Sequence, residues 1–166
     1  MSETITRERR ITWTDPAALA AEAPGSAGLD FIGKIVRGEL PPPPIADLME
    51  MRIVSAEPGS VVFTMAPAEY MFNPIGSVHG GAITTILDSA IGCAVQTTLP
   101  RGTVYTTIDI QVRFVRAVTL ASGTLTAIGT VTHSGRRLAV GEAVLRDADG
   151  RICATATSSC MVVGAA

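Results

Sequence analysis

The sequence predicts an α+β fold in which an antiparallel β-sheet wraps around one long central α-helix. Three observations lead to this prediction. Residues 79–98 form one long segment whose apolar side chains recur at the 3.6-residue period of a helix. Segments with the two-residue period of a strand lie before and after it. The helix is apolar around so much of its circumference that protein must cover most of it, and a sheet with one apolar face can do so.

The composition points to a single globular domain that buries extra surface in an oligomer. A chain of 166 residues suits one domain and needs no disulfides to fold. Hydrophobic residues make up 47% of it and charged residues 17%, which favours a dimer or tetramer. The net charge of −2 gives no electrostatic reason to expect nucleic acid. The three cysteines are odd in number and form no C-x-x-C pair, so buried thiols are expected, not a disulfide framework or a metal site.

No membrane or secretion signal is expected. The first thirteen residues are charged and lack the apolar stretch of a signal peptide. The most apolar stretch, 82–95, is interrupted by Asp88 and is shorter than the roughly 20 residues of a membrane span. We therefore expect a soluble, cytoplasmic protein.

The first forty residues are expected at the periphery. Asp15-Pro16 predicts the start of a short helix at 17–22, and the apolar spacing at 29–36 predicts a second. The prolines at 41–44 predict a stiff extended connector, with an SH3-type ligand as the alternative. Residues 1–44 would thus form an extension, 45–163 the sheet-and-helix domain and 164–166 a C-terminal tail.

The strands are predicted from alternation and turn residues. The first would place Met49, Met51 and Ile53 on one face. After the helix, Ile108, Ile110, Val112 and Phe114 are expected to share a face, and the four later strands to form a meander. The predicted strands are 47–55, 61–65, 107–114, 123–132, 137–145 and 151–163, the fourth and fifth joined by a hairpin at 133–136.

The start of the long helix carries the candidate catalytic residues Asn73, His79, Gly80, Gly81 and Asp88. A helix N-terminus presents unpaired N–H groups and a partial positive charge. Glycines there let a ligand approach the backbone closely. The His79-Gly80-Gly81 segment therefore suits a carbonyl oxygen that becomes an oxyanion.

Asp88 interrupts an apolar helix. A buried carboxylate is costly without a partner or a function. Asp88 is therefore either a hydrogen-bonded structural residue or a nucleophile or general base. The corresponding structural alternatives are a helix cap for His79 and a turn residue before Pro74 for Asn73.

Helix geometry has a consequence for assembly. Gly80 and Asp88 are eight residues apart, which is about 12 Å of helix rise. A catalytic carboxylate must lie within about 3 Å of what it attacks or deprotonates. We therefore expect two antiparallel helices across a two-fold axis, so that Gly80 of one copy meets Asp88 of the other.

The pattern Asn73-x5-His79-Gly80-Gly81-x6-Asp88, followed by Thr107-Ile108-Asp109, resembles the phenylacetate-degradation-type (PaaI-like) acyl-CoA thioesterases. These belong to the hot-dog superfamily that includes the 4-hydroxybenzoyl-CoA thioesterases. The resemblance spans about 45–163. It implies a hot-dog fold and hydrolysis of an aryl- or short- to medium-chain acyl-CoA to acid and CoA, without cofactor or metal.

The resemblance also implies a role for each residue of the pattern. Asp88 would be nucleophile or general base, and the Gly80 amide would polarise the thioester carbonyl. Asn73 and His79 would orient substrate or water. Thr107 would position the water, with Thr106 as the alternative because neighbouring strand residues face opposite ways.

Coenzyme A carries phosphates, so arginines are candidate ligands. The hairpin that the resemblance implies for the CoA nucleotide carries Arg136 and Arg137 after the Ser134-Gly135 turn. A solvated basic patch is the alternative, and His133 is expected at the surface. The remaining candidates are Arg113 and Arg116 at a strand end, Gly81, and Phe72 with Tyr70 near the acyl group.

Two other functions remain open at this stage. The same fold can bind acyl-CoA without turnover. A hydratase or dehydratase would need an Asp–His acid–base pair, which the helix segment does not offer. The aromatic content of 4% does not distinguish an aryl from an aliphatic acyl group.

Overall fold

A computed structural model describes residues 5–164, so residues 165 and 166 of the expected C-terminal tail lie outside it, as do residues 1–4. The helices are α1 (Pro16–Glu22), α2 (Gly28–Val36), α3 (Pro44–Leu48) and α4 (Gly80–Thr97). The strands are β1 (Met51–Glu57), β2 (Ser60–Met65), β3 (Thr103–Phe114), β4 (Leu125–Ser134), β5 (Leu138–Arg146) and β6 (Ile152–Gly164). Short 3₁₀ turns occur at η1 (Ala23–Gly25), η2 (Glu69–Met71) and η3 (Leu120–Ser122).

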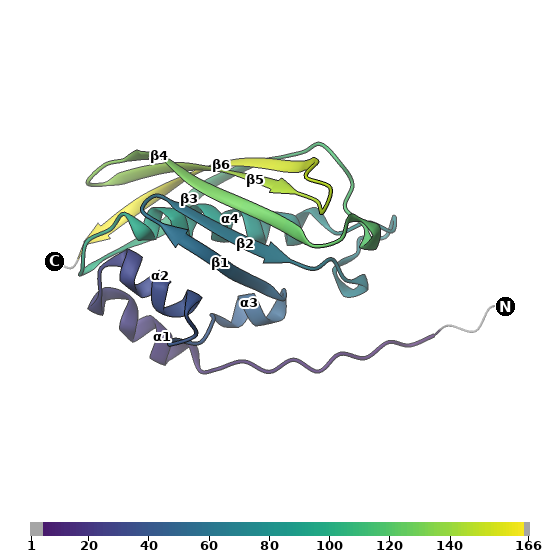
Figure 1. Ribbon diagram of the computed structural model, residues 1–166, viewed down its shortest axis with the longest axis horizontal. Coiled ribbons are helices and arrows are strands. Elements are labelled where there is room, and N and C mark those ends of the chain that lie inside the picture. The colour runs from purple at the N-terminus through teal and green to yellow at the C-terminus, as the bar shows by residue number, and fades with distance from the viewer. Residues whose placement is uncertain (1–4, 165–166) are drawn as a thin grey trace.

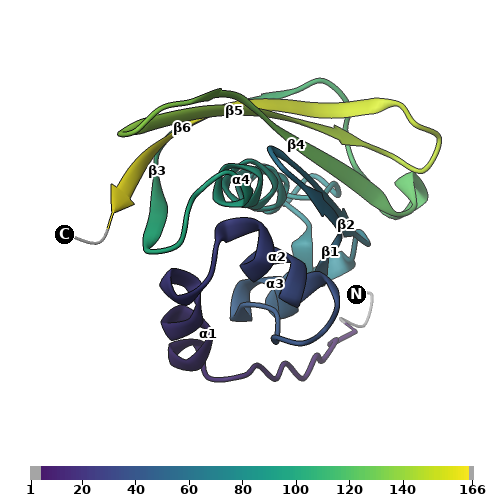
Figure 2. The same ribbon diagram turned by 60° about the vertical axis from the view of Figure 1, so that its left-hand side comes forward.

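The six strands form one antiparallel sheet in the order β1-β2-β4-β5-β6-β3. The sheet curves over α4, and α1, α2 and α3 lie on the opposite side of that helix (Figures 1 and 2). The predicted α+β hot-dog arrangement, a sheet wrapped around a central helix, is therefore confirmed. The predicted helices at 17–22, 29–36 and 79–98 are confirmed to within a residue or two.

The core lies between α4 and the concave face of the sheet. Ile86, Leu87, Ala90 and Ile91 on α4 are fully buried. The helix backbone approaches β4 so closely that a methyl group on Gly129 would meet the carbonyl oxygen of Ala90 at 2.2 Å. This contact fixes the position of α4 along the sheet, and with it the residues that α4 carries.

The predicted strand at 47–55 is wrong at its start. Residues 44–48 form α3 instead, because Pro44 stands at the first helical position, where its fixed φ and missing N–H are tolerated. Glu50 follows with a φ of 51°, which ends the helix and starts the strand. Met49 therefore lies outside β1, and the proline connector ends at Pro43.

The predicted four-strand meander is also wrong. Of the four strands after α4, β4, β5 and β6 are successive neighbours, whereas β3 pairs with β6 at the far edge of the sheet. The connection after β3 passes through η3 and crosses the width of β6 and β5 before β4 begins. Alternation within strands does not encode which strands are neighbours, so the sequence pattern could not show this crossover.

A bulge in β3 changes which side chains face α4. The register with β6 shifts between Thr107 and Asp109, and a bulge adds one unpaired residue to the strand. Thr107 faces inward before the bulge and Ile110 after it, whereas Ile108 is 55% exposed. The prediction that Ile108 and Ile110 share a face of the strand is therefore wrong.

Within residues 5–164, no helix combines the length and the apolar character that crossing a lipid bilayer requires.

Candidate active site at the central helix

Asp88 lies half-buried in the middle of α4, beside β3. The Thr107 hydroxyl donates a hydrogen bond of 3.0 Å to Asp88 Oδ1. Thr106, the register alternative, is exposed on the other face of the strand. Among the described residues, no hydrogen bond reaches Asp88 Oδ2, and this oxygen is not among the buried polar atoms without a partner. One carboxylate oxygen is thus held by Thr107, and the other is open to an incoming group.

Two ionisable groups beside Asp88, the Cys93 thiol and the Tyr105 hydroxyl, are uncharged at neutral pH. Burial, and secondarily the Asp88 charge, raises the pKa of the Cys93 thiol to about 12. Burial is also the main reason why the pKa of the Tyr105 hydroxyl is raised well above its usual value, with Cys93 and Asp88 contributing. No cation of residues 5–164 forms an ion pair with Asp88. The carboxylate therefore stands without a counter-charge in an apolar surrounding.

The start of α4 leaves the Gly80 amide available. His79 is the N-cap, and its Nδ1 accepts a hydrogen bond of 2.8 Å from the Gly81 amide. The His79 carbonyl accepts from the Ala82 amide. In the part of the chain that is described, no protein acceptor is recorded for the Gly80 amide. Of the two predicted glycines, Gly80 can therefore donate to a ligand, whereas the Gly81 amide is occupied by His79.

Asn73 closes the loop that precedes α4. Its Oδ1 accepts from the amides of Ile75 and Ser77, at 3.1 and 3.2 Å, and its Nδ2 donates to Ser77 Oγ at 3.0 Å. The observed position of the side chain is that of a turn residue. The loop places Asn73 in the same cavity as Gly80.

Gly80 and Asp88 open into different cavities of one chain. The first, of about 350 Å³, contains Gly80, Asn73, Phe114 and Arg116. The second, of about 790 Å³, contains Asp88 and extends along α4 toward the N-terminal helices. Eight residues of α4, about 12 Å, separate the amide from the carboxylate. One chain therefore does not bring the two groups to the same substrate atom.

A third hollow, of about 480 Å³, is lined by Phe72, Tyr70, His79 and Gly81. Phe72 is thus brought near the cap of α4 but not into the cavity of Asp88. Arg9 lies over the Tyr70 ring, 3.8 Å from its centroid. Tyr70 is in this way tied to the N-terminal segment.

The predicted CoA-binding arginines fall into separate groups. Arg116 lies with Gly80, and Arg113 is exposed on β3 nearby in the chain. Arg136 and Arg137 are exposed in the β4–β5 hairpin, where Ser134 Oγ lies 3.4 Å from Thr98 Oγ1 at the opposite end of α4. That helix has 18 residues, or about 27 Å of rise. One chain does not gather these groups into a single phosphate site.

Three residues beside Asp88 escaped the sequence analysis. Ser89, Cys93 and Gln96 line the same cavity as the carboxylate. They recur at i, i+4 and i+7, the spacing of one helix face. Polar or thiol side chains at that spacing in an apolar helix were a signal that could have identified this wall.

The segment that carries this site is similar to known proteins. The model of the thioesterase superfamily matches residues 75–154, the segment that contains both Gly80 and Asp88. Over this segment the chain is similar to the thioesterase superfamily. This match, together with an esterase-named relative, supports a hydrolase activity on thioesters.

Individual relatives support the same activity. A Deinococcus radiodurans protein provisionally named an esterase is 29% identical over 89% of this chain and 86% of its own length. A phenylacetic acid degradation-related protein of Ralstonia eutropha superimposes with a TM-score of 0.71 at 28% identity, over 78% of this chain and 97% of its own. The smu.793 protein of Streptococcus mutans, solved with acetyl CoA, gives 0.64 at 28% identity, over 69% and 90%.

Proposed function

We propose that this thioesterase hydrolyses an acyl-CoA at a site that two copies of the chain share, with the Gly80 amide of one copy and Asp88 of the other. One observation carries the proposal: a free amide and an open carboxylate oxygen lie about 12 Å apart and open into different cavities of one chain. The bound acetyl CoA of the Streptococcus mutans relative supports CoA as the leaving group.

The chemistry follows from the two groups. As a general base, Asp88 Oδ2 takes a proton from water, and the resulting hydroxide attacks the thioester carbonyl carbon. The Gly80 amide donates to the carbonyl oxygen as it becomes negative. The C–S bond then breaks, the acid is released and the CoA thiolate takes up the proton. Direct attack by Asp88, with hydrolysis of the resulting anhydride, is the other route that the same geometry supports.

Thr107 acts through Asp88. Its hydrogen bond holds Oδ1, so that Oδ2 faces the substrate. A hydrogen bond to a charged acceptor contributes about 1.5–3 kcal/mol. We assign Thr107 the role of positioning the carboxylate, and His79 and Asn73 the role of shaping the turn that presents the Gly80 amide.

Two surfaces support a dimer. Strand β3 is an edge of the sheet, and it is 12 residues long, so it offers a row of unpaired backbone groups to a second copy. On α4, Gly81, Thr84, Thr85, Asp88 and Ser89 remain partly or fully exposed along one stripe. If Gly80 of one copy faces Asp88 of the other, the two-fold axis passes near residue 84, the midpoint, where the side chains are small.

The arginines complete the proposal. In such a dimer the hairpin with Arg136 and Arg137 and the cavity with Arg116 come from different copies. Among residues 5–164, none of these guanidinium groups is paired with a carboxylate. They are available for the phosphates of CoA.

A hydratase is less compatible with the site. It would need a histidine as the acid–base partner of Asp88. His79 Nδ1 is engaged with the Gly81 amide, and His133 is exposed on the β4–β5 hairpin. No hydrogen bond joins a histidine to Asp88 within the described chain.

The proposal is tested with two variants that each remove one group. Gly80→Pro deletes the N–H at the first helical position, where proline fits the helix and the extended ψ of 137° at His79 suits a residue before proline. Gly80→Ala is the matched control, because it adds a side chain near Phe114 but keeps the N–H. Asp88→Asn removes the base. We expect kcat to fall about 100- to 1,000-fold in Gly80→Pro relative to Gly80→Ala, and about 100- to 10,000-fold in Asp88→Asn.

Mixing the two inactive variants decides whether the site is shared. A heterodimer of Gly80→Pro and Asp88→Asn contains one intact composite site and one doubly altered site. Random reassociation should therefore restore about one quarter of the wild-type activity. No recovery in a verified heterodimer would place both groups in one chain and contradict the proposal. CoA binding without thiol release in the wild-type protein would favour a binding module instead.

A further inference from the structure

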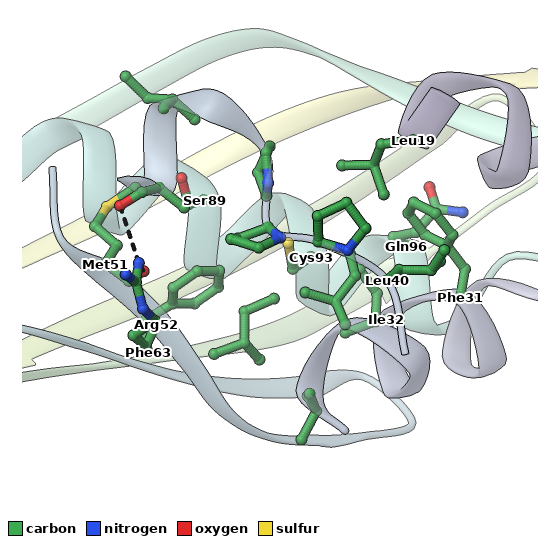
Figure 3. Close-up of a pocket in the computed structure, with 18 of the residues that line it drawn as sticks. Leu19, Phe31, Ile32, Leu40, Met51, Arg52, Phe63, Ser89, Cys93 and Gln96 are labelled. Atoms are coloured by element: carbon green, nitrogen blue, oxygen red, sulfur yellow. Dashed lines mark hydrogen bonds between the residues drawn. The ribbon is translucent and has the colours of Figure 1, made fainter. Parts of the chain in front are cut away.

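The cavity that Asp88 lines extends far beyond the reacting group. Its volume is about 790 Å³, within the range of pockets that enclose a small molecule. Asp88 and Ser89 line it, and Cys93 and Gln96 continue the same wall along α4 (Figure 3). From Asp88 to Gln96 is eight residues, or about 12 Å. The cavity is therefore deep enough for a substrate group that extends well past the carbonyl.

The opposite wall comes from the N-terminal segment. Phe31, Ile32 and Ile35 of α2 line it, together with Leu40 and the prolines 41–43 (Figure 3). Phe31 and Ile32 are buried, and α2 packs against both α4 and β1. This segment lies outside the residues 75–154 that the family model matches. This wall of the cavity thus comes from outside the matched region, whereas the wall on α4 lies within it.

The lining excludes a charged guest. Besides Asp88, its charged side chains are Asp47 and Arg52, and these lie 3.5 Å from each other as an ion pair. Most of the other lining side chains are aliphatic, aromatic or proline. An apolar chain gains roughly fourfold in affinity for each methylene that it buries, whereas a carboxylate or ammonium group there would lose its hydration without a partner.

We propose that this cavity binds the acyl part of the substrate, an unbranched aliphatic chain of medium length, and that residues 31–43 set the length. The inference rests on the proposed function, because the thioester must lie at Asp88. An extended chain advances about 1.2 Å per bond, as three backbone bonds span about 3.6 Å. A depth of about 12 Å thus accommodates about ten carbons.

Two substitutions away from Asp88 change the length of the cavity in opposite directions. Cys93→Phe fills it five residues, about 7.5 Å, beyond Asp88. Ile32→Ala enlarges the opposite wall. Asp30→Ala is the matched control, because Asp30 lies on the same helix and does not line the cavity. Each variant is compared with the wild type by kcat/KM for acetyl-, hexanoyl-, decanoyl-, palmitoyl- and phenylacetyl-CoA.

The wild type should give its highest kcat/KM with decanoyl-CoA. The decanoyl-to-acetyl ratio should fall about 100-fold in Cys93→Phe, as several methylenes lose their site. In Ile32→Ala the optimum should move toward palmitoyl-CoA, and in Asp30→Ala the profile should not move. Binding of 1-decanol, an uncharged chain of the same length, measured by calorimetry, should weaken at least tenfold in Cys93→Phe.

The acyl site and the thioesterase activity can be refuted separately. Chain-length profiles identical to the wild type in both cavity variants, with Asp88→Asn inactive, would overturn the acyl site and leave the thioesterase proposal standing. A preference for phenylacetyl-CoA that neither variant alters would do the same. If the wild type hydrolysed none of the five thioesters, the proposed function would fail, and 1-decanol binding would still decide whether the cavity takes an aliphatic chain.

Discussion

The two halves of α4 differ in what covers them. In residues 80–89, Gly80, Gly81, Thr84, Thr85, Asp88 and Ser89 remain at least partly exposed, and only the side facing the sheet is buried. In residues 90–97 every residue except Cys93 is buried, and α2 packs against the side that faces away from the sheet. The first half is open at the reactive groups, whereas the second half is enclosed by its own chain.

This difference separates stability from function along one helix. The C-terminal half is held by backbone approaches that leave no space, as at Gly129 against Ala90 and at Gly28 against Gln96. The N-terminal half has no such contact at Gly80, where an added methyl group would meet only the Phe114 ring, at 3.1 Å. A rigid second half therefore positions an open first half, which a second copy can complete.

The largest effect is expected from closing the open stripe to a second copy. Thr84→Arg places a long charged side chain at the proposed two-fold axis, so the dimer should dissociate and each site should lose the Gly80 amide of its partner. We expect kcat to fall at least about 100-fold. Analytical ultracentrifugation and thiol-release assays measure both changes. Thr130→Arg on the exposed face of β4 is the control, and a monomer with wild-type turnover would refute the shared site.

In the enclosed half, a substitution should lower stability instead of changing turnover. Gly129→Ala forces a methyl group to 2.2 Å from the Ala90 carbonyl oxygen, and backbone cannot yield as a flexible side chain does. We expect the free energy of unfolding to fall by about 3 kcal/mol. Denaturant titration measures this loss. The matched change Gly80→Ala in the open half should cost well under half as much, and equal losses would remove the distinction between the two halves.

In the open half of α4, the hydrogen bond between Thr107 and Asp88 should affect catalysis. Thr107→Val keeps the shape of the side chain and removes the donor to Asp88 Oδ1. We expect kcat to fall about tenfold with little change in KM, since one hydrogen bond to a charged group contributes about 1.5–3 kcal/mol. Thr106→Val is the adjacent control on the other strand face. An equal effect in both variants would show a general disturbance of β3.

The N-terminal half of α4 could be predicted from the sequence more completely than the elements around it. The helix, its cap and the Asn73-to-Asp88 spacing are local features, and local periodicity predicts them. The inward position of Thr107 depends on a bulge that only pairing with β6 creates, so alternation alone left Thr106 as an alternative. The pairing of β3 with β6 is long-range and has no local signal.

The N-terminal segment shows the same limit. The two helices at 17–22 and 29–36 were predictable from caps and spacing. That α2 covers the second half of α4, and that residues 31–43 form a wall of the Asp88 cavity, depends on tertiary packing. The helix at α3 was missed because Met49, Met51 and Ile53 also fit the two-residue period of a strand, and short apolar segments satisfy either pattern.

The smallest effect concerns Cys93, which lies where the two halves meet. Its pKa of about 12 in the folded chain exceeds the unfolded value of about 9. Below pH 9 the thiol is protonated in both states and contributes nothing to the pH dependence. Between pH 9 and 12 the unfolded chain loses this proton first, so stability should fall as pH rises, by up to about 1.4 kcal/mol per pH unit. Unfolding titrations at pH 8, 9.5 and 10.5 measure the slope.

Cys93→Ala should flatten this slope, because the substituted chain has no thiol to ionise at that position. Asp88→Asn should flatten it only in part, since burial is the larger cause of the shift and the Asp88 charge the smaller one. The slope of the unfolding free energy against pH should be steepest in the wild type, intermediate in Asp88→Asn and shallowest in Cys93→Ala. This order detects the Asp88 charge inside the cavity without any substrate. A slope in Asp88→Asn equal to that of the wild type would mean that the Asp88 charge does not affect the pKa of Cys93. The open half of α4 would then end before the acyl cavity begins.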